Sequence, residues 1–296
     1  MSERRHARGP AVGRAIGWIG LGAIGLPMAR RAASAGWQVF AFDPSPERQD
    51  AARAAGLNLV ASITEVAARG GDLVVCVVRT LGQVDEVLLG DDGILGVDDP
   101  PLAVVMSSVG AAGLADLARR AGSTGGRLVD APILGNPAGA AAGTLTLVVS
   151  GTTHDVATAR PLLADLAASV VVLGEEIGLG QTVKMVSQLR QIVGMVATIE
   201  GVELATRRGA DEQAVLAVLS ATEPSWATEH WAYASRLWEG RDRATSLGIF
   251  AKDLAAAVSD AEAAGLGLPL TQEAHRLIEE RLEARDLGDG QPRDGS

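Results

Sequence analysis

Lysine occurs at only two positions of this 296-residue chain, Lys184 and Lys252, and arginine supplies the rest of its 26 basic residues. Arginine stays protonated at any working pH, whereas a desolvated lysine can release and regain a proton. Lys184 lies in an apolar helical stretch, 181–188, directly after the turn Gly178-Leu-Gly180. We therefore predict that Lys184 is a general acid and base. A solvated lysine whose stem lies along the surface is the alternative.

A glycine-rich turn follows the first β-branched run of the chain and opens a helical stretch. Gly20 would make the tight turn, Gly22 would let the backbone approach a pyrophosphate, and Gly25 would let helix and strand pack closely. In this strand-to-helix context the pattern predicts a dinucleotide site. The residues expected to bind the cofactor here are Gly20, Leu21, Gly22, Ala23, Ile24 and Gly25.

The next predicted strand ends at Asp43, about twenty residues after the glycine turn. A carboxylate there accepts hydrogen bonds from the adenosine ribose hydroxyls and repels a 2′-phosphate. We therefore predict NAD as the cofactor, and the nearby Arg48 keeps NADP as the alternative. The alternative without a ligand is an ordinary glycine-rich turn, with Asp43 as an acidic cap before Pro44.

The predicted secondary structure that positions these residues changes once along the chain, from alternating strands and helices to helices alone. From Ala15 to Leu173, short β-branched runs alternate with Ala-rich helical stretches, which predicts an α/β fold with a mostly parallel sheet covered on both faces. After Gly180 only helical patterns follow. We predict a disordered arm, a Rossmann-type dinucleotide-binding domain, an all-helical substrate and dimerisation domain and a disordered tail. Their ranges are 1–13, 14–176, 177–287 and 288–296.

Composition excludes several other classes of function. The net charge is −10 and the basic residues are dispersed, which argues against nucleic-acid binding. No run of about 18 apolar residues predicts a membrane span. Cys76 is the single cysteine and lies in a predicted strand, so we expect a buried inert thiol and a reducing cytoplasm. The four histidines lack metal-ligand spacing, and no Gly-x-Ser-x-Gly motif is present, so metal and serine-hydrolase chemistry are not expected.

The segment 20–29 resembles the opening signature of the β-hydroxyacid dehydrogenases. Three later segments are similar to further motifs of that family: 130–145 to its substrate loop, 178–184 to its catalytic lysine segment and 251–254 to a cofactor-side motif. The resemblance implies hydride transfer between nicotinamide and a β-hydroxy acid or its aldehyde or keto acid. It also implies that Lys184 is the catalytic residue.

The same resemblance completes the cofactor site. Ser108 stands where the family places a hydroxyl beside the nicotinamide. Val78 and Arg79 replace the family's usual Leu-Pro turn near the ribose. Lys252 would face the cofactor from the helical domain, with an ordinary exposed lysine as the alternative.

The predicted substrate residues depart from the family pattern. Related enzymes commonly have Ser-Gly-Gly where this chain has Leu134, Gly135 and Asn136, so we expect an anion to be held by Gly135 and Asn136 with fewer contacts. Gln188, four residues after the lysine, replaces the usual Asn. Gln191 replaces the glutamate of 6-phosphogluconate dehydrogenase. An amide cannot donate or accept a proton as a carboxylic acid does at neutral pH, so we expect no decarboxylation.

Aromatic residues are concentrated in the segment 226–238. Trp226 and Trp231 there either pack in a core or subunit interface, or form an apolar wall for a substrate bulkier than three- or four-carbon acids. The long apolar helix expected at 182–208 favours a homodimer or homotetramer assembled through the helical domain.

Two other functions stay open at this point. Leu134 and the tryptophans would suit an imine reductase, although such enzymes usually lack the lysine. A non-catalytic nucleotide-binding module with the same fold is the alternative of another class. The sequence names no individual substrate, direction of reaction or stereochemistry.

Overall fold

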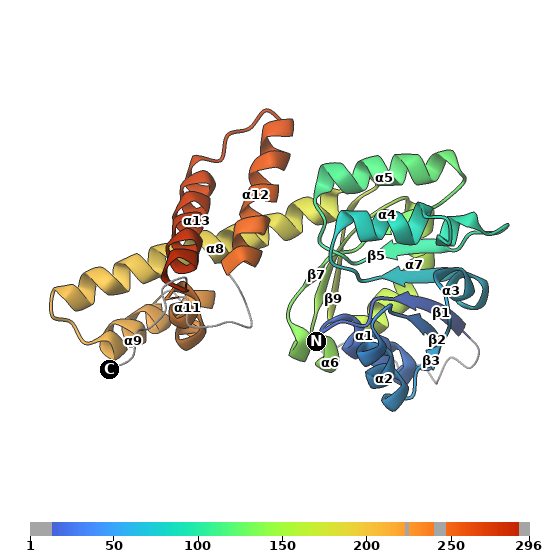
Figure 1. Ribbon diagram of the computed structural model, residues 1–296, viewed down its shortest axis with the longest axis horizontal. Helices are drawn as coiled ribbons and strands as arrows, with labels where there is room; N and C mark the ends of the chain where they lie inside the picture. The colour runs from blue at the N-terminus through green and yellow to red at the C-terminus, as the bar shows by residue number, and fades with distance from the viewer. Residues whose placement is uncertain (1–13, 223–224, 240–246, 290–296) are drawn as a thin grey trace, which may run out of the picture. The chain divides into compact units, whose positions relative to one another are not determined.

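The computed structural model describes residues 14–222, 225–239 and 247–289, without the side chains of 226 and 284–289 (Figure 1). The predicted arm 1–13 lies outside these residues, as do 290–296 of the predicted tail. The chain divides into two compact units, Met1–Lys184 and Met185–Ser296. The boundary falls inside a continuous helix, α8 (Leu179–Arg207), a few residues after the turn at which the strand patterns stop.

The first unit is built on one sheet with the strand order β3-β2-β1-β4-β5-β6-β8-β7, and β9 pairs with β8. The first six strands are mutually parallel, β8 runs antiparallel to β6 and β7, and β9 runs parallel to β8. This order reverses direction between β1 and β4, as in a doubly wound nucleotide-binding sheet. The strands are β1 (Arg14–Ile19), β2 (Trp37–Phe42), β3 (Asn58–Leu59), β4 (Leu73–Cys76), β5 (Leu102–Val105), β6 (Leu128–Asp130), β7 (Ile133–Leu134), β8 (Thr146–Ser150) and β9 (Ser169–Gly174).

Helices cover both faces of this sheet, and successive strand residues alternate between two apolar cores. Ile16 and Trp18 of β1 belong to one core, and Ile19 to the other. One face carries α1 (Gly25–Ser34), α2 (Pro46–Ala54), α6 (Pro137–Ala142) and α7 (Thr153–Leu166). The other carries α3 (Ile63–Arg69), α4 (Leu81–Leu89), the short 3-10 turn η1 (Ile94–Gly96) and α5 (Ala111–Ser123).

The second unit is helical throughout its described residues. Besides α8, it contains α9 (Glu212–Thr222), α10 (Trp226–Glu229), α11 (Trp231–Trp238), α12 (Leu247–Ala263) and α13 (Pro269–Asp289). Its core buries Ile192, Val196 and Ile199 of α8, whose i, i+4, i+7 spacing puts them on one face of the helix. The segment 226–238 forms two helices. The second begins at Trp231, and the carbonyl of its N-cap residue, His230, accepts from the Tyr233 and Ala234 N–H groups.

The structure confirms the predicted fold class, a Rossmann-type domain followed by a helical region. In the described part of the chain, the helices are either too short or too polar to cross a bilayer.

Candidate active site

The glycine turn lies between β1 and α1, and the surrounding backbone leaves no room for a side chain at two of its three glycines. Gly20 has φ +98°, and a Cβ there would lie 2.1 Å from the Val77 carbonyl oxygen. A Cβ on Gly25 would lie 2.1 Å from the Gly20 carbonyl oxygen, whereas one on Gly22 would meet nothing within 4 Å. Backbone therefore packs tightly on two sides of the turn, and the side at Gly22 is left open.

The N-terminus of α1 is suited to an anion. Its N-cap residue, Ile24, makes no side-chain capping bond, and the first turn contains no acidic residue. By contrast α2, α3 and α4 are each capped by a hydroxyl, from Ser45, Ser62 and Thr80. The amide groups at the start of α1 therefore suit a pyrophosphate, which the helix dipole also favours.

Asp43 comes directly after β2, and its carboxylate is almost completely buried. Its Oδ2 accepts from the Leu21 backbone N–H at 2.8 Å, and its Oδ1 accepts from the Ser45 N–H at 2.9 Å. The Arg48 guanidinium lies 3.4 Å from Oδ2. The carboxylate thus ties the glycine turn to the loop after β2, and Arg48 offsets part of its charge.

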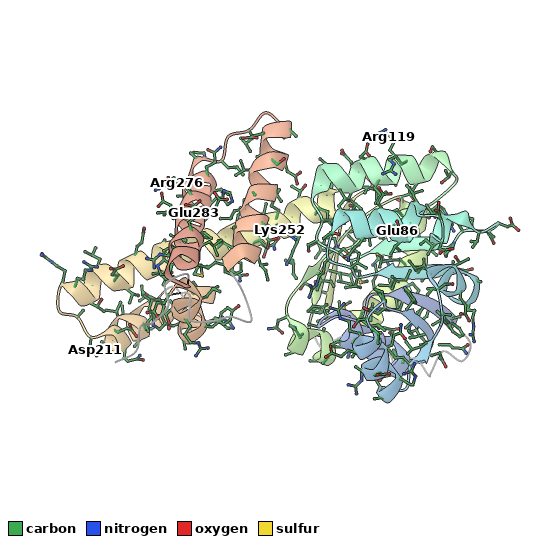
Figure 2. The ribbon with its side chains drawn as sticks, in the orientation of Figure 1. Glu86, Arg119, Asp211, Lys252, Arg276 and Glu283 are labelled. Carbon is green, nitrogen blue, oxygen red and sulfur yellow. The ribbon has the colours of Figure 1, made fainter. Side chains whose placement is uncertain are left out.

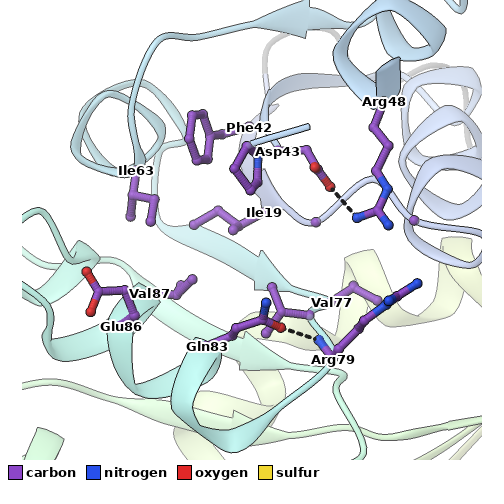
Figure 3. A pocket seen from close by; sticks show the side chains of 14 residues that line it. Ile19, Phe42, Asp43, Arg48, Ile63, Val77, Arg79, Gln83, Glu86 and Val87 are labelled. Atoms are coloured by element: carbon purple, nitrogen blue, oxygen red, sulfur yellow. Dashed lines mark hydrogen bonds and ion pairs between the residues drawn. The ribbon is translucent and has the colours of Figure 1, made fainter. Parts of the chain in front are cut away.

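A cavity of about 490 Å³ opens where the strand order reverses, at the ends of β1, β2 and β4 (Figure 3). This is the place where a doubly wound sheet binds a nucleotide. In Figure 3 Arg48 lies beside Asp43, and Arg79 lies across the pocket, beside Gln83. The lining includes five predicted cofactor residues: Gly20, Gly22, Asp43, Val78 and Arg79. It also includes apolar and polar residues that the sequence analysis missed: Ile19, Phe42, Ile63, Val77, Gln83, Glu86 and Val87.

The turn after β4 is held by the segment after β5. The Val78 N–H donates to Ser107 Oγ at 2.8 Å, and the Arg79 N–H donates to Gln83 Oε1 at 2.9 Å. Proline at position 79, as in the usual Leu-Pro turn, would lack that second donor. Ser107 is buried, and the neighbouring Ser108, predicted beside the nicotinamide, is exposed.

The predicted substrate loop forms a short strand and a capped helix. Leu134 is half-buried in β7 and pairs with Thr146 of β8. Gly135 has φ +140° and is exposed. Asn136 caps α6, because its Oδ1 accepts from the Gly139 N–H at 2.8 Å. Because Oδ1 is used in this bond, Nδ2 is the atom of the Asn136 side chain that could donate to an anion.

Lys184 lies in the second turn of α8 and is half-buried. The first turn of α8 is fixed by residues to which the sequence analysis gave no role. Asp130, at the end of β6, accepts hydrogen bonds from both the backbone and the side chain of Gln181. Asp130 and Gln181 lie in two of the segments that resemble motifs of the family, 130–145 and 178–184. Their pairing was not visible, since they are 51 positions apart.

Gln188 and Lys252 belong to the helical unit. Gln188 Nε2 donates to Asp253 Oδ2 at 2.5 Å, which joins α8 to the segment 251–254 within this unit. Lys252 is exposed on α12 (Figure 2).

Of the two tryptophans predicted to contact the substrate, the structure describes the side chain of one. The Trp226 side chain lies outside the described residues. Trp231 packs partly against the helical core, and its Nε1 donates to Glu212 Oε1 at 3.1 Å.

Two families match this chain in succession. Residues 15–174 match the NAD binding domain of 6-phosphogluconate dehydrogenase. Residues 178–292 match the family described as NAD-binding of NADP-dependent 3-hydroxyisobutyrate dehydrogenase. The two matched regions follow the division into a Rossmann-type and a helical part.

Individual relatives agree with the family matches. L-threonate dehydrogenase of Cupriavidus necator is 33% identical over 90% of this chain and 89% of that protein. The structure of 3-hydroxyisobutyrate dehydrogenase from Salmonella typhimurium is 28% identical, covers 91% of this chain and 94% of that chain, and has a TM-score of 0.78. An imine reductase from Myxococcus stipitatus in complex with NAD+ covers 92% of this chain and 95% of that chain, with 17% identity and a TM-score of 0.67, a likeness of fold alone.

A doubly wound domain with a dinucleotide pocket, followed by a helical unit, defines a nicotinamide-dependent oxidoreductase. The chain belongs to the β-hydroxyacid dehydrogenase family and is an NAD(P)-dependent dehydrogenase or reductase of that family.

Proposed function

We propose that this enzyme transfers a hydride between NAD and a β-hydroxy acid or its aldehyde or keto acid, with Lys184 as the general acid and base. The observation that carries this proposal is the position of Lys184, half-buried near the start of a helix whose first turn is anchored in the nucleotide-binding unit. The enzyme works in the cytoplasm as a homodimer or homotetramer through its helical unit.

The residues of the glycine turn fit a dinucleotide. The open side of Gly22 and the uncapped start of α1 would hold the pyrophosphate, and Asp43, Val78 and Arg79 would line the adenosine ribose pocket. Ser108 and Lys252 are the remaining residues proposed to contact the cofactor. When bound, the nicotinamide supplies the hydride acceptor or donor.

Lys184 handles the proton that accompanies the hydride. When an alcohol is oxidised, the neutral amine takes the hydroxyl proton as the C–H hydride leaves; in the reverse direction the ammonium returns that proton to the carbonyl oxygen. Because position 191 holds Gln, the proton donor that a decarboxylating enzyme needs there is missing, and the reaction ends at hydride transfer.

Relatives named for L-threonate and 3-hydroxyisobutyrate suggest a hydroxy acid as substrate. The carboxylate would be held by the exposed Gly135 backbone and by Asn136 Nδ2. Leu134 brings an apolar surface where related enzymes have a hydroxyl, so the acid is expected to carry an apolar substituent. Gln188, Trp226 and Trp231 are the other residues proposed to contact the substrate.

Replacement of each lysine tests the catalytic assignment. Lys184→Ala and Lys184→Arg should lower kcat on the order of 100- to 10,000-fold while the Kd for NADH, measured by fluorescence, stays the same. Lys252→Arg is the comparison, since it should raise the KM for NAD and spare kcat. Full turnover in Lys184→Arg would refute the role of Lys184.

A substrate screen tests the class of reaction. NADH oxidation should be followed with aldehyde acids, keto acids and cyclic imines, with both cofactors. Turnover of imines alone would favour the imine reductase, for which Leu134 is the supporting residue. Nucleotide binding without turnover of any substrate would favour the non-catalytic module.

A further inference from the structure

The end of β6 is hydrogen-bonded directly to the start of α8, the helix that carries Lys184. Asp130 Oδ2 accepts from the backbone N–H groups of Gly178 and Gln181, each at 3.2 Å, and from Ser150 Oγ at 3.2 Å. Asp130 Oδ1 accepts from Gln181 Nε2 at 2.8 Å. A carboxylate from the end of β6 thus caps the first turn of α8, where the helix dipole favours negative charge.

Gln181 also binds the segment after β5. Its Nε2 donates to the Ser107 carbonyl oxygen at 3.0 Å, and its Oε1 accepts from the Val109 N–H at 2.9 Å. The side chain therefore bridges the residues on either side of Ser108 to Asp130. These bonds fix the direction of the amide, because Ser107 offers an acceptor and Val109 a donor.

The packing around this network leaves no room for side chains at two neighbouring positions. Gly178 has φ +105°, and a Cβ there would lie 3.0 Å from the Ala111 carbonyl oxygen. A Cβ on Gly180 would lie 2.7 Å from Asp130 Oδ2 and 2.8 Å from the Val148 carbonyl oxygen. The glycines therefore let the start of α8 lie against the end of β6.

We propose that Asp130 and Gln181 are positioning residues that hold the first turn of α8, and with it Lys184, in register with the segment that carries Ser108. Lys184 is four residues after Gly180 and three after Gln181, so it shares their side of the helix one turn further on. A helix that is capped and packed at its first turn transmits a displacement there to the next turn. This inference rests on the proposed catalytic role of Lys184.

Variants that keep the shape of each side chain but exchange amide and carboxylate can test the network. In Gln181→Glu, a carboxylate oxygen replaces Nε2 and faces two acceptors, Asp130 Oδ1 and the Ser107 carbonyl. In Asp130→Asn, an amide nitrogen replaces Oδ1 and faces Gln181 Nε2. In the double variant the new amide faces the new carboxylate, so the bond between positions 130 and 181 forms again with donor and acceptor exchanged.

We expect each single variant to lower kcat on the order of 10- to 100-fold, with the KM for NAD unchanged, because a shift of about 1 Å in a catalytic group has effects of this size. The pH dependence of kcat should also move, since Lys184 changes its surroundings. The double variant should lose less than the product of the two single losses. Two controls are Gln213→Glu, an exposed change of the same kind on α9, and Val156→Ala, which weakens the α7 core without touching the network.

The outcomes separate this inference from the proposed function. If Lys184→Arg is inactive while Gln181→Glu and Asp130→Asn keep the wild-type kcat and pH profile, the positioning role is wrong and the proposed function stands. The inference fails, and the network is only structural, if the two single losses of kcat simply multiply in the double variant. It also fails if Val156→Ala, with the same loss of Tm as the single network variants, lowers kcat as much as they do. If Lys184→Arg keeps full activity, the proposed function itself fails.

Discussion

The Leu21 backbone N–H donates to the Asp43 carboxylate at 2.8 Å, which joins the glycine turn to a residue that lines the cavity. If the proposed cofactor site is right, phosphate position and ribose recognition are coupled through this one side chain. Because the Ser45 N–H and Arg48 also point to this carboxylate, its loss has consequences for stability as well as for cofactor choice.

Replacement of Asp43 should change the choice of cofactor. Asp43→Asn keeps an acceptor for one backbone N–H but removes the charge, so the preference for NAD over NADP should fall by roughly 10-fold or more, the worth of a charge-assisted hydrogen bond. Asp43→Ala should also cost about 1–3 kcal/mol of unfolding free energy for each buried donor left unpaired. Titration with both cofactors and denaturant unfolding measure the two effects. An unchanged NAD to NADP ratio of Kd in Asp43→Asn would contradict the assignment.

Two glycines of the same turn should respond oppositely to alanine. Gly25→Ala places a Cβ 2.1 Å from the Gly20 carbonyl oxygen and should lower stability by at least about 1–3 kcal/mol. Gly22→Ala meets no atom within 4 Å, so Tm should stay unchanged while NAD affinity falls. Thermal unfolding without cofactor, followed by NADH titration, separates the two. Normal NADH affinity in Gly22→Ala would show that the phosphate does not approach this side.

The Gln188 side chain is tied to Asp253 inside the helical unit. Gln188→Asn restores the family's usual residue but shortens the side chain, so the bond to the carboxylate should be lost at a cost of about 1.5–3 kcal/mol. Denaturant unfolding would measure this. Gln272→Asn, an exposed change on α13, is the matched control and should have no effect. Equal stability of Gln188→Asn and wild type would mean that the bond contributes nothing.

Burial raises the pKa of the Cys76 thiol to about 12. Since the thiolate is the reactive form, the native protein at pH 8 should resist thiol reagents, and the thiol should react only after unfolding. A colorimetric thiol assay with and without denaturant measures this. Rapid labelling of the folded enzyme would contradict the inert, buried thiol.

Burial also raises the pKa of Asp130, against the opposing effect of its hydrogen bonds. The native state therefore keeps this proton at pH values where the unfolded chain, with a pKa of about 3.9, has released it. The resulting stabilisation is complete below the unfolded pKa and is lost as the pH rises through the native one. Wild type should thus lose its advantage over Asp130→Asn as the pH is raised from about 4. Denaturant unfolding at several pH values would measure the difference, and an advantage that grows with pH would contradict the sign.

Local patterns were enough for much of the fold. The alternation of β-branched runs with helical stretches predicted the doubly wound sheet, because period and propensity are properties of neighbours along the chain. The division at His230 between α10 and α11 is not visible in the sequence, since the segments on both sides have good helical patterns. For the site, the glycine turn and Asp43 were predicted to act together, and they line one cavity.

The sequence by itself was enough to predict a dinucleotide site, because a strand, three glycines at fixed spacing and a carboxylate meet the steric and charge needs of that ligand residue by residue; the rare Lys184 led to the hypothesis of an acid–base group. The hydrogen-bond partners of the site residues were decided by the tertiary structure alone. Asp130 meets Gln181 because β6 ends beside the start of α8, and Asn136 is engaged as a helix cap because α6 begins there. Hydrogen bonds between residues 51 positions apart depend on how the sheet brings strand ends and helix ends together, which no local pattern encodes.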